Sequence, residues 1–117
     1  MRQNYLTDAF SLNMLKSFPS MLVAVELDVR YFCAQIDLLT KENDLISALR
    51  YSNSAKIINT LCGVPIQKNK IEIKVDKGDT LYVVLPRFKI DDGMEMDEKT
   101  IKRIYGEGRI KFYKVVL

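Results

Sequence analysis

The sequence predicts a single α/β domain in which a mixed β-sheet is flanked by helices. Three observations indicate this class: a length of 117 residues, a balance of 48% hydrophobic and 28% charged residues, and strand patterns that alternate with helical patterns. No repeat, linker or low-complexity segment divides residues 1–117. We therefore expect one compact core, with part of the apolar surface left for a partner subunit.

The first third of the chain predicts two strands and a helix. A short strand is expected at residues 4–6, followed by a loop of small and polar residues at 7–13. The apolar run 21–27 predicts a second, mostly buried strand. Asp28 can cap the next helix, whose apolar residues fall at helical spacing. These residues are Val29, Phe32, Cys33 and Ile36.

A further helix is predicted in the middle of the chain. Residues 44–49 are expected to form a short apolar helical turn. Ser52 or Asn53 can then serve as the N-cap of a helix at 54–61. Gly63 would end that helix, because glycine readily adopts the left-handed C′ conformation.

A β-hairpin is predicted from residues 70–75 and 80–85. Apolar and charged residues alternate in its first arm, which is the period of a half-exposed strand. Gly78 lies in the turn, where a positive φ is favoured, and Pro86 is expected to end the second arm. The chain then predicts a loop at 89–96.

The C-terminal segment predicts a helix and a closing strand. Asp97 can cap a short helix that carries Ile101 and Ile104, and residues 109–117 form the last strand. These elements complete the expected mixed sheet.

Charge and cysteine content exclude several classes of protein. The net charge of +3 suits a small anionic ligand but is too weak to favour binding of long nucleic acid. Cys33 and Cys62, with no histidine in the chain, cannot supply a four-ligand zinc site. We expect both to be small buried hydrophobic side chains rather than a disulfide. With no signal-peptide pattern and no apolar run of about 20 residues, we expect a soluble intracellular protein.

The absence of histidine bears directly on function. Histidine is the side chain whose ordinary pKa lets it donate and accept protons near neutral pH. A chain without it must use another group for acid–base chemistry, or act by binding alone.

Three stretches carry a recognisable family pattern in their order and spacing. They are YLTDAFSLNML at 5–15, SALRYSNSAKIINTLCG at 47–63, and QKNKIEIK at 67–74 followed by GDTLYVV at 78–84. Together they resemble the small viral anti-CRISPR ring-nuclease family, which destroys cyclic tetra-adenylate, the second messenger of type III CRISPR immunity. The resemblance implies a two-fold dimer with the ligand at its interface, and cleavage without metal or other cofactor. In active members a ribose 2′-hydroxyl attacks the adjacent phosphate while a histidine protonates the leaving oxygen.

The resemblance places altered residues at the positions of the catalytic groups. Tyr51 stands where the family has its histidine, Lys89 where it has an arginine that steadies the phosphate, and Asp92 where it has an assisting glutamate. A tyrosine is a weaker general acid than an imidazolium, and lysine lacks the bidentate fork of arginine. The combined changes argue against efficient cleavage.

The resemblance also implies a set of ligand-binding residues. Ser11 and Asn13 are retained, whereas Asp8 replaces an asparagine and Arg50 replaces a glycine. Arg50 can either support or fill the ligand pocket, and Asp8 can pair with it. The amides at the predicted helix start are further candidates for anion contact, because helix N-termini attract phosphate. They belong to Ser52, Asn53 and Ser54.

The leading hypothesis is therefore a viral anti-CRISPR protein that counters type III immunity by binding rather than by efficient cleavage. It would act as a homodimer in the cytoplasm of the infected host cell, on a cyclic oligoadenylate or on a type III effector protein. Two alternatives remain: an active metal-independent ring nuclease, and a viral accessory protein that binds nucleic acid.

Overall fold

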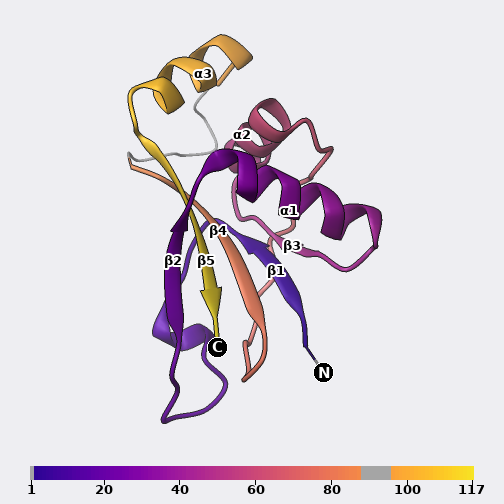
Figure 1. The fold of residues 1–117 in the computed structure, drawn as a ribbon, viewed down its shortest axis with the longest axis vertical. Coiled ribbons are helices and arrows are strands. Elements are labelled where there is room, and N and C mark those ends of the chain that lie inside the picture. The colour runs from indigo at the N-terminus through magenta and orange to yellow at the C-terminus, as the bar shows by residue number, and fades with distance from the viewer. Residues whose placement is uncertain (1, 88–95) are drawn as a thin grey trace.

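The computed structural model describes residues 2–87 and 96–117, which form one α/β unit with a mixed five-stranded sheet and three α-helices (Figure 1). The predicted fold class is confirmed. In chain order the elements are β1 Asn4–Thr7, the 3-10 turn η1 Leu12–Met14, β2 Val23–Leu27, α1 Val29–Lys41, β3 Ile46–Ala48, α2 Ser52–Cys62, β4 Thr80–Pro86, α3 Glu98–Gly106 and β5 Ile110–Val116.

The sheet has the strand order β2-β5-β4-β1-β3. β1 lies between β4 and β3 and runs parallel to both, so that Tyr5 is opposite Leu81 on one side and Ile46 on the other. β5 pairs antiparallel with β4 and with β2. Because β1, β3 and β4 are parallel, their carboxyl ends meet at one edge of the sheet.

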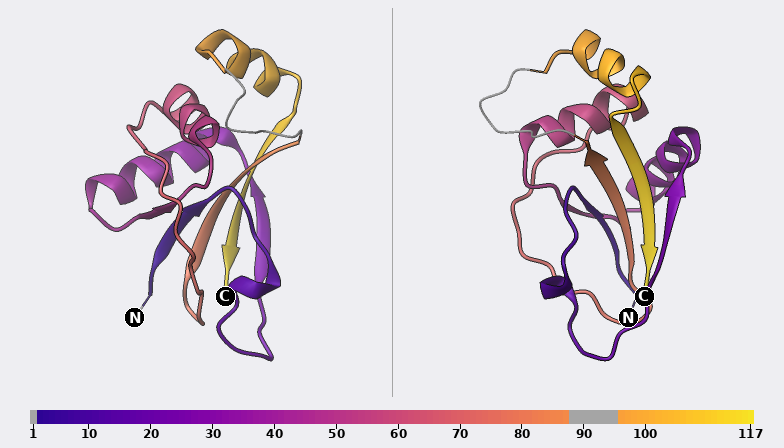
Figure 2. Two further views of the ribbon diagram at one scale, coloured as in Figure 1. Left: turned by 180° about the vertical axis from the view of Figure 1, so that it is seen from behind. Right: turned by 90° about the vertical axis from the view of Figure 1, so that its left-hand side faces the viewer.

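Apolar side chains cover both faces of the sheet. On the helical face, α1 and α2 bury Phe32, Ile36, Ile57 and Ile58 against the strands. Figure 2 shows these helices gathered on one side of the sheet. On the opposite face, Leu15, Ile73 and Val75 pack against Leu81, Val83 and Val115. That second layer is built from irregular chain rather than from helices.

The predicted hairpin is wrong. Residues 70–75 form no strand, and within the described residues Val75 makes only an isolated parallel bridge with Leu15. β4 pairs instead with β1 and β5. The alternating pattern reflects the burial of Ile73 and Val75 on the face of the sheet opposite the helices. These side chains are buried because the segment packs on that face, without pairing as a strand.

Two other expectations about the sheet are corrected. β2 is an exposed edge strand rather than a buried one, since Val23 keeps 63% of its surface exposed. Residues 44–49 contain the strand β3, not a helical turn. Both segments are short, so their apolar pattern alone cannot distinguish a strand from a buried helix. It also does not show how deeply a strand is buried.

Most of the predicted helix ends are confirmed. The Asp28 carboxylate accepts a hydrogen bond from the Arg30 N–H at the start of α1, and Asp97 accepts one from Thr100 at the start of α3. Gly63 ends α2 with a φ of 69°. The N-cap of α2 is Tyr51, however, so the prediction of Ser52 or Asn53 at that position is wrong.

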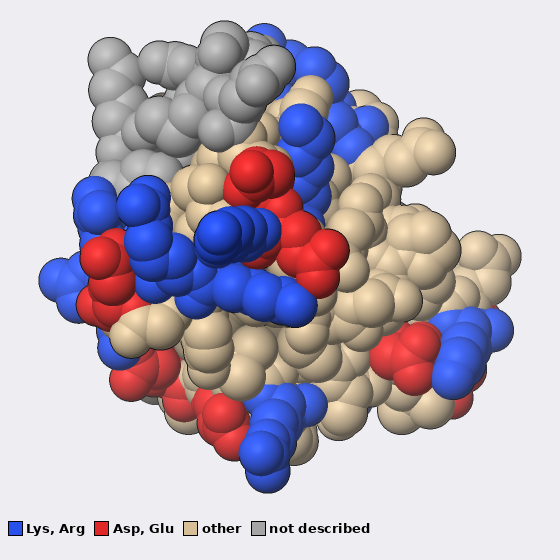
Figure 3. Space-filling model, turned by 90° about the horizontal axis from the view of Figure 1, so that it is seen from above, with Lys and Arg blue, Asp and Glu red and all other residues tan. Residues whose placement is uncertain are grey.

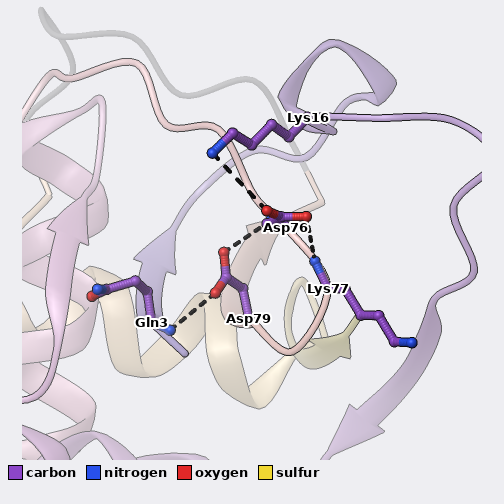
Figure 4. Close-up of polar contacts among 5 residues, drawn as sticks. All are labelled: Gln3, Lys16, Asp76, Lys77 and Asp79. Carbon is purple, nitrogen blue, oxygen red and sulfur yellow. Dashed lines mark hydrogen bonds and ion pairs between the residues drawn. The ribbon is translucent and has the colours of Figure 1, made fainter. Parts of the chain in front are cut away.

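A buried carboxylate joins the chain termini to the turn before β4. Asp79 is only 3% exposed, and its two oxygens accept hydrogen bonds from the Gln3 N–H (3.0 Å) and the Asp76 N–H (2.9 Å) (Figure 4). Its main-chain oxygen accepts a further bond from Leu117. Burial, and then the nearby Asp79 charge, raise the pKa of the Tyr5 hydroxyl. These contacts fix the end of the sheet that lies opposite α3.

Cys33 and Cys62 form a disulfide that joins α1 to α2, so the expectation of two unbonded cysteines is wrong. The two residues are 29 positions apart in sequence, but their Cα atoms lie 4.9 Å apart because the two helices pack side by side. Within residues 2–87 and 96–117, no helix has the length and apolar character that crossing a bilayer requires.

Removal of the disulfide should destabilise the fold. A variant carrying both Cys33→Ala and Cys62→Ala is expected to lose about 2–4 kcal/mol of unfolding free energy, because the crosslink restricts the unfolded chain. Urea unfolding followed by circular dichroism measures this loss. Wild-type protein reduced with dithiothreitol serves as the control, and an unchanged urea midpoint in both samples would contradict a stabilising role.

Candidate ligand-binding site

A pocket of about 340 Å³ opens at the edge of the sheet where β1 and β3 end. Thr7 and Ala48, the last residues of these strands, both contribute to its wall. Parallel strands commonly place ligands just beyond their carboxyl ends, because the following loops diverge there. The pocket therefore lies where this topology favours a binding site.

The lining combines charged and polar groups with apolar surface. The polar and charged members are Thr7, Ser11, Asn13, Arg50, Glu72 and Lys74. The apolar members are Ala9, Phe10, Met14, Ala48, Ile71 and Ile73. Two cations and one carboxylate give the pocket a net positive lining, which favours an anionic ligand with a hydrophobic part.

The Asp8 carboxylate holds the segment between β3 and α2 in place. The Arg50 N–H lies 3.1 Å from Asp8 Oδ1 and 3.0 Å from Oδ2, and the Tyr51 N–H donates to Oδ2 at 3.2 Å. Asp8 is 9% exposed, so these bonds compensate a largely buried charge. They connect the chain after β1 to the chain after β3.

The Asp8 carboxylate occupies a position in which main-chain N–H groups would otherwise be able to bind an anion. Successive main-chain N–H groups ahead of a helix form a concavity that binds anions, and a carboxylate near a helix N-terminus is electrostatically favourable. Here the N–H groups of Arg50 and Tyr51 already face Asp8. A ligand phosphate therefore cannot use these two N–H groups while Asp8 holds them.

Three of the predicted binding residues line the pocket together. Ser11 and Asn13 come from the loop after β1, and Arg50 comes from the segment before α2. Asp8 contacts the main chain of Arg50, and the described ion pairs include none between Asp8 and the Arg50 guanidinium. A cavity of about 340 Å³ is present with Arg50 on its wall.

The other predicted site residues lie elsewhere. Tyr51, at the N-cap of α2, is 38% exposed, and it does not line the pocket. Ser52 is exposed beside it, whereas Asn53 and Ser54 are buried, and the hydroxyl of Ser54 has no hydrogen-bond partner within the described residues. Two further candidates, Lys89 and Asp92, lie outside the residues that the structure describes.

Two charged lining residues were not predicted from the sequence. Glu72 and Lys74 fell in the arm of the expected hairpin, where charged residues are ordinarily solvated. The structure instead places both at the pocket, and the Lys74 ammonium donates to the Asn13 carbonyl oxygen at 2.6 Å. Their position within the stretch QKNKIEIK, which carries the family pattern, was the one available signal.

Glu72 and Lys74 belong to a strap segment, residues 67–75, that crosses the pocket. At one end the Asn69 side-chain amide donates to the Ser47 carbonyl oxygen at 2.7 Å. At the other end the Val75 N–H donates to the Met14 carbonyl oxygen at 2.7 Å. The strap segment is thus fixed on both sides of the pocket, which holds its charged side chains near the cavity.

Comparison with known proteins identifies the family of the chain. A family model described as STIV B116-like matches residues 4–113, which include the whole pocket. The chain belongs to the STIV B116-like family. The solved structure of B116 of Sulfolobus turreted icosahedral virus (STIV) is similar over 98% of this chain and 99% of its own, with a TM-score of 0.88 and 36% identity.

A second relative is more distant in sequence. "Uncharacterized protein ORF116" of Acidianus filamentous virus 1 is 23% identical over 110 residues, which cover 94% of this chain and 91% of that protein. Both relatives come from archaeal viruses. The B116-like family thus accounts for nearly the whole chain.

The surface around α3 mixes charges of both signs. Figure 3 views the end of the molecule that bears α3 and shows acidic side chains among the basic ones. Three ion pairs in this region are Lys102 with Glu98, Arg109 with Glu107, and Lys111 with Glu26. Within its described part this face has no unbroken basic patch of the kind that favours long nucleic acid.

Asp8 should contribute strongly to stability because it organises the segment before α2. Asp8→Ala removes the acceptor of two main-chain N–H groups and is expected to cost roughly 2–4 kcal/mol of unfolding free energy. Asp8→Asn should fall between this variant and wild type, since one acceptor oxygen remains. Urea unfolding measures both.

Asp44→Ala is the matched control for Asp8→Ala. Asp44 is exposed and accepts one bond, from the Asn4 side chain at 3.3 Å. It should change the unfolding free energy by less than about 0.5 kcal/mol. Equal effects of Asp8→Ala and Asp44→Ala would refute the organising role of Asp8.

Proposed function

We propose that this protein is a viral anti-CRISPR protein that binds a cyclic oligoadenylate in the pocket beside Arg50 and cleaves it inefficiently or not at all. The single observation that carries the proposal is the convergence of Ser11, Asn13 and Arg50 on one cavity. The resemblance to ring nucleases had picked out these residues separately. Membership of a family with archaeal viral relatives supports the proposed setting.

The charge of the pocket suits a phosphate-bearing ligand. Arg50 supplies a planar cation with several donors that matches phosphate geometry, and Lys74 supplies a second cation from the strap segment. Phe10, Ile71 and Ile73 offer apolar surface for a nucleobase. A nucleotide contains both kinds of group, which is why we favour it over an inorganic anion.

The pocket volume bears on stoichiometry. About 340 Å³ is near the small end of the range of ligand pockets, about 300–1,000 Å³, and can hold only part of a ring of four nucleotides. We therefore propose that two copies of the chain face one ring, each pocket taking half of it. A two-fold dimer would match the symmetry of such a ring.

Binding is favoured over cleavage because the pocket lacks an efficient acid. The chain has no histidine, and the tyrosine at the corresponding position lies outside the pocket lining. A positioned general acid contributes about 10²–10⁴ in rate, so its loss alone slows the reaction severely. The bound ring would then be sequestered rather than destroyed.

Arg50→Gln should weaken ligand binding. Isothermal titration of cyclic tetra-adenylate into wild-type protein, in the presence of EDTA, is expected to give saturable binding with one ring per two chains. Arg50→Gln should raise the Kd by about tenfold or more, because it removes a charge-assisted contact. Arg30→Gln, an exposed change on α1, is the matched control and should bind as wild type does. No binding by the wild-type protein at micromolar concentrations would sink the proposal.

Replacement of Tyr51 should not turn the protein into an efficient nuclease. In a metal-free single-turnover assay, wild-type protein, Tyr51→Phe and Tyr51→His are all expected to yield no linear di-adenylate over hours, because position 51 lies outside the pocket lining and a general acid must lie within hydrogen-bond reach of the leaving oxygen. Linear di-adenylate formed by the wild-type protein would show that it is an active nuclease, and loss of that product in Tyr51→Phe would assign the acid to Tyr51.

A further inference from the structure

Glu72 is the one carboxylate among the described residues that line the pocket. It is exposed, and none of the ion pairs in the described part of the chain includes it. Neither Arg50 nor Lys74, the two cations of the lining, neutralises it by direct pairing. A carboxylate in this position needs a partner when a ligand displaces water from the pocket.

The chemistry of Glu72 restricts what that partner can be. An ionised carboxylate only accepts hydrogen bonds, so it repels a phosphate and matches an N–H or O–H group. Glu72 comes from the strap segment, whereas Arg50 comes from the chain before α2. A ligand that fills the pocket should therefore present an anionic group to Arg50 and a hydrogen-bond donor to Glu72.

The surroundings of Glu72 favour a nucleobase donor over a sugar hydroxyl. Its neighbours in sequence, Ile71 and Ile73, also line the pocket and supply apolar surface suited to a flat ring. Among purines, adenine carries an amino donor at its six position. A purine that is unsubstituted at this position lacks the donor and presents only its N1 acceptor on that edge, which an ionised carboxylate cannot satisfy.

We propose that Glu72 is a specificity-determining residue that selects a nucleotide whose base carries an amino donor and rejects a purine that lacks this group. The inference rests on the proposed function for the ring-shaped ligand, but the selection itself applies to any nucleotide that enters the pocket. It assigns recognition of the base to Glu72 and recognition of the phosphate to Arg50 and Lys74.

The test compares two bases on three proteins. Cyclic tetra-adenylate and its analogue with unsubstituted purine in place of adenine are titrated into wild-type protein, Glu72→Gln and Glu42→Gln, and AMP and purine riboside monophosphate are titrated in parallel. Wild type should prefer the adenine ligand by about tenfold or more, because the unsubstituted purine leaves a charged acceptor unpaired. Glu72→Gln should reduce this preference to within about threefold, since an amide can donate to the N1 acceptor of the unsubstituted purine as well as accept from an amino group.

Glu42→Gln, an exposed change at the end of α1, should keep the wild-type preference. The inference is overturned if wild type shows no preference or if Glu72→Gln keeps the wild-type preference. It is also overturned if Glu72→Gln weakens the binding of both bases equally, which would indicate that Glu72 contacts the sugar. If neither ring binds but wild type prefers AMP over purine riboside monophosphate through Glu72, selection stands and the ring proposal fails. If none of the four ligands binds, the selection by Glu72 and the ring proposal are both overturned. A urea midpoint for Glu72→Gln equal to that of wild type establishes that the variant is folded.

Discussion

The hydrogen bonds from the Arg50 and Tyr51 N–H groups to the Asp8 carboxylate are the constraint on which the site depends. They join the end of β1 to the start of α2, two segments more than 40 residues apart in sequence. Because Asp8 is largely buried, its charge has to be compensated there, and the main chain must keep this geometry. Arg50, which lines the pocket, is held at this place in the chain by its own N–H group.

The same contact limits how the pocket could bind an anion. With the Arg50 and Tyr51 N–H groups engaged by Asp8, the cationic groups of the lining are the side chains of Arg50 and Lys74. We propose that these two side chains hold the ligand, and that a protein without histidine does not cleave it efficiently.

Local signals in the sequence predicted much of the fold, and contacts between distant segments account for the errors. Asp28 and Gly63 act on their own helix ends, so residue type alone was informative. The alternating pattern at 70–75 indicated which side chains are buried but not which segment they pack against. The disulfide could not be predicted because it depends on how α1 packs on α2. For the site, family resemblance led to Ser11, Asn13 and Arg50, whereas Glu72 and Lys74 required the path of the strap segment.

The central claim is that the pocket beside Arg50 holds a cyclic oligoadenylate intact. NMR of one sample tests it most directly: ¹⁵N-labelled protein titrated with cyclic tetra-adenylate, with the ³¹P spectrum recorded alongside. The account predicts the largest amide shift changes at Ser11, Asn13, Arg50 and residues 71–74, while the ³¹P signals remain those of the ring. Shift changes centred on β2 or α3, or the growth of a 2′,3′-cyclic phosphate signal, would contradict it.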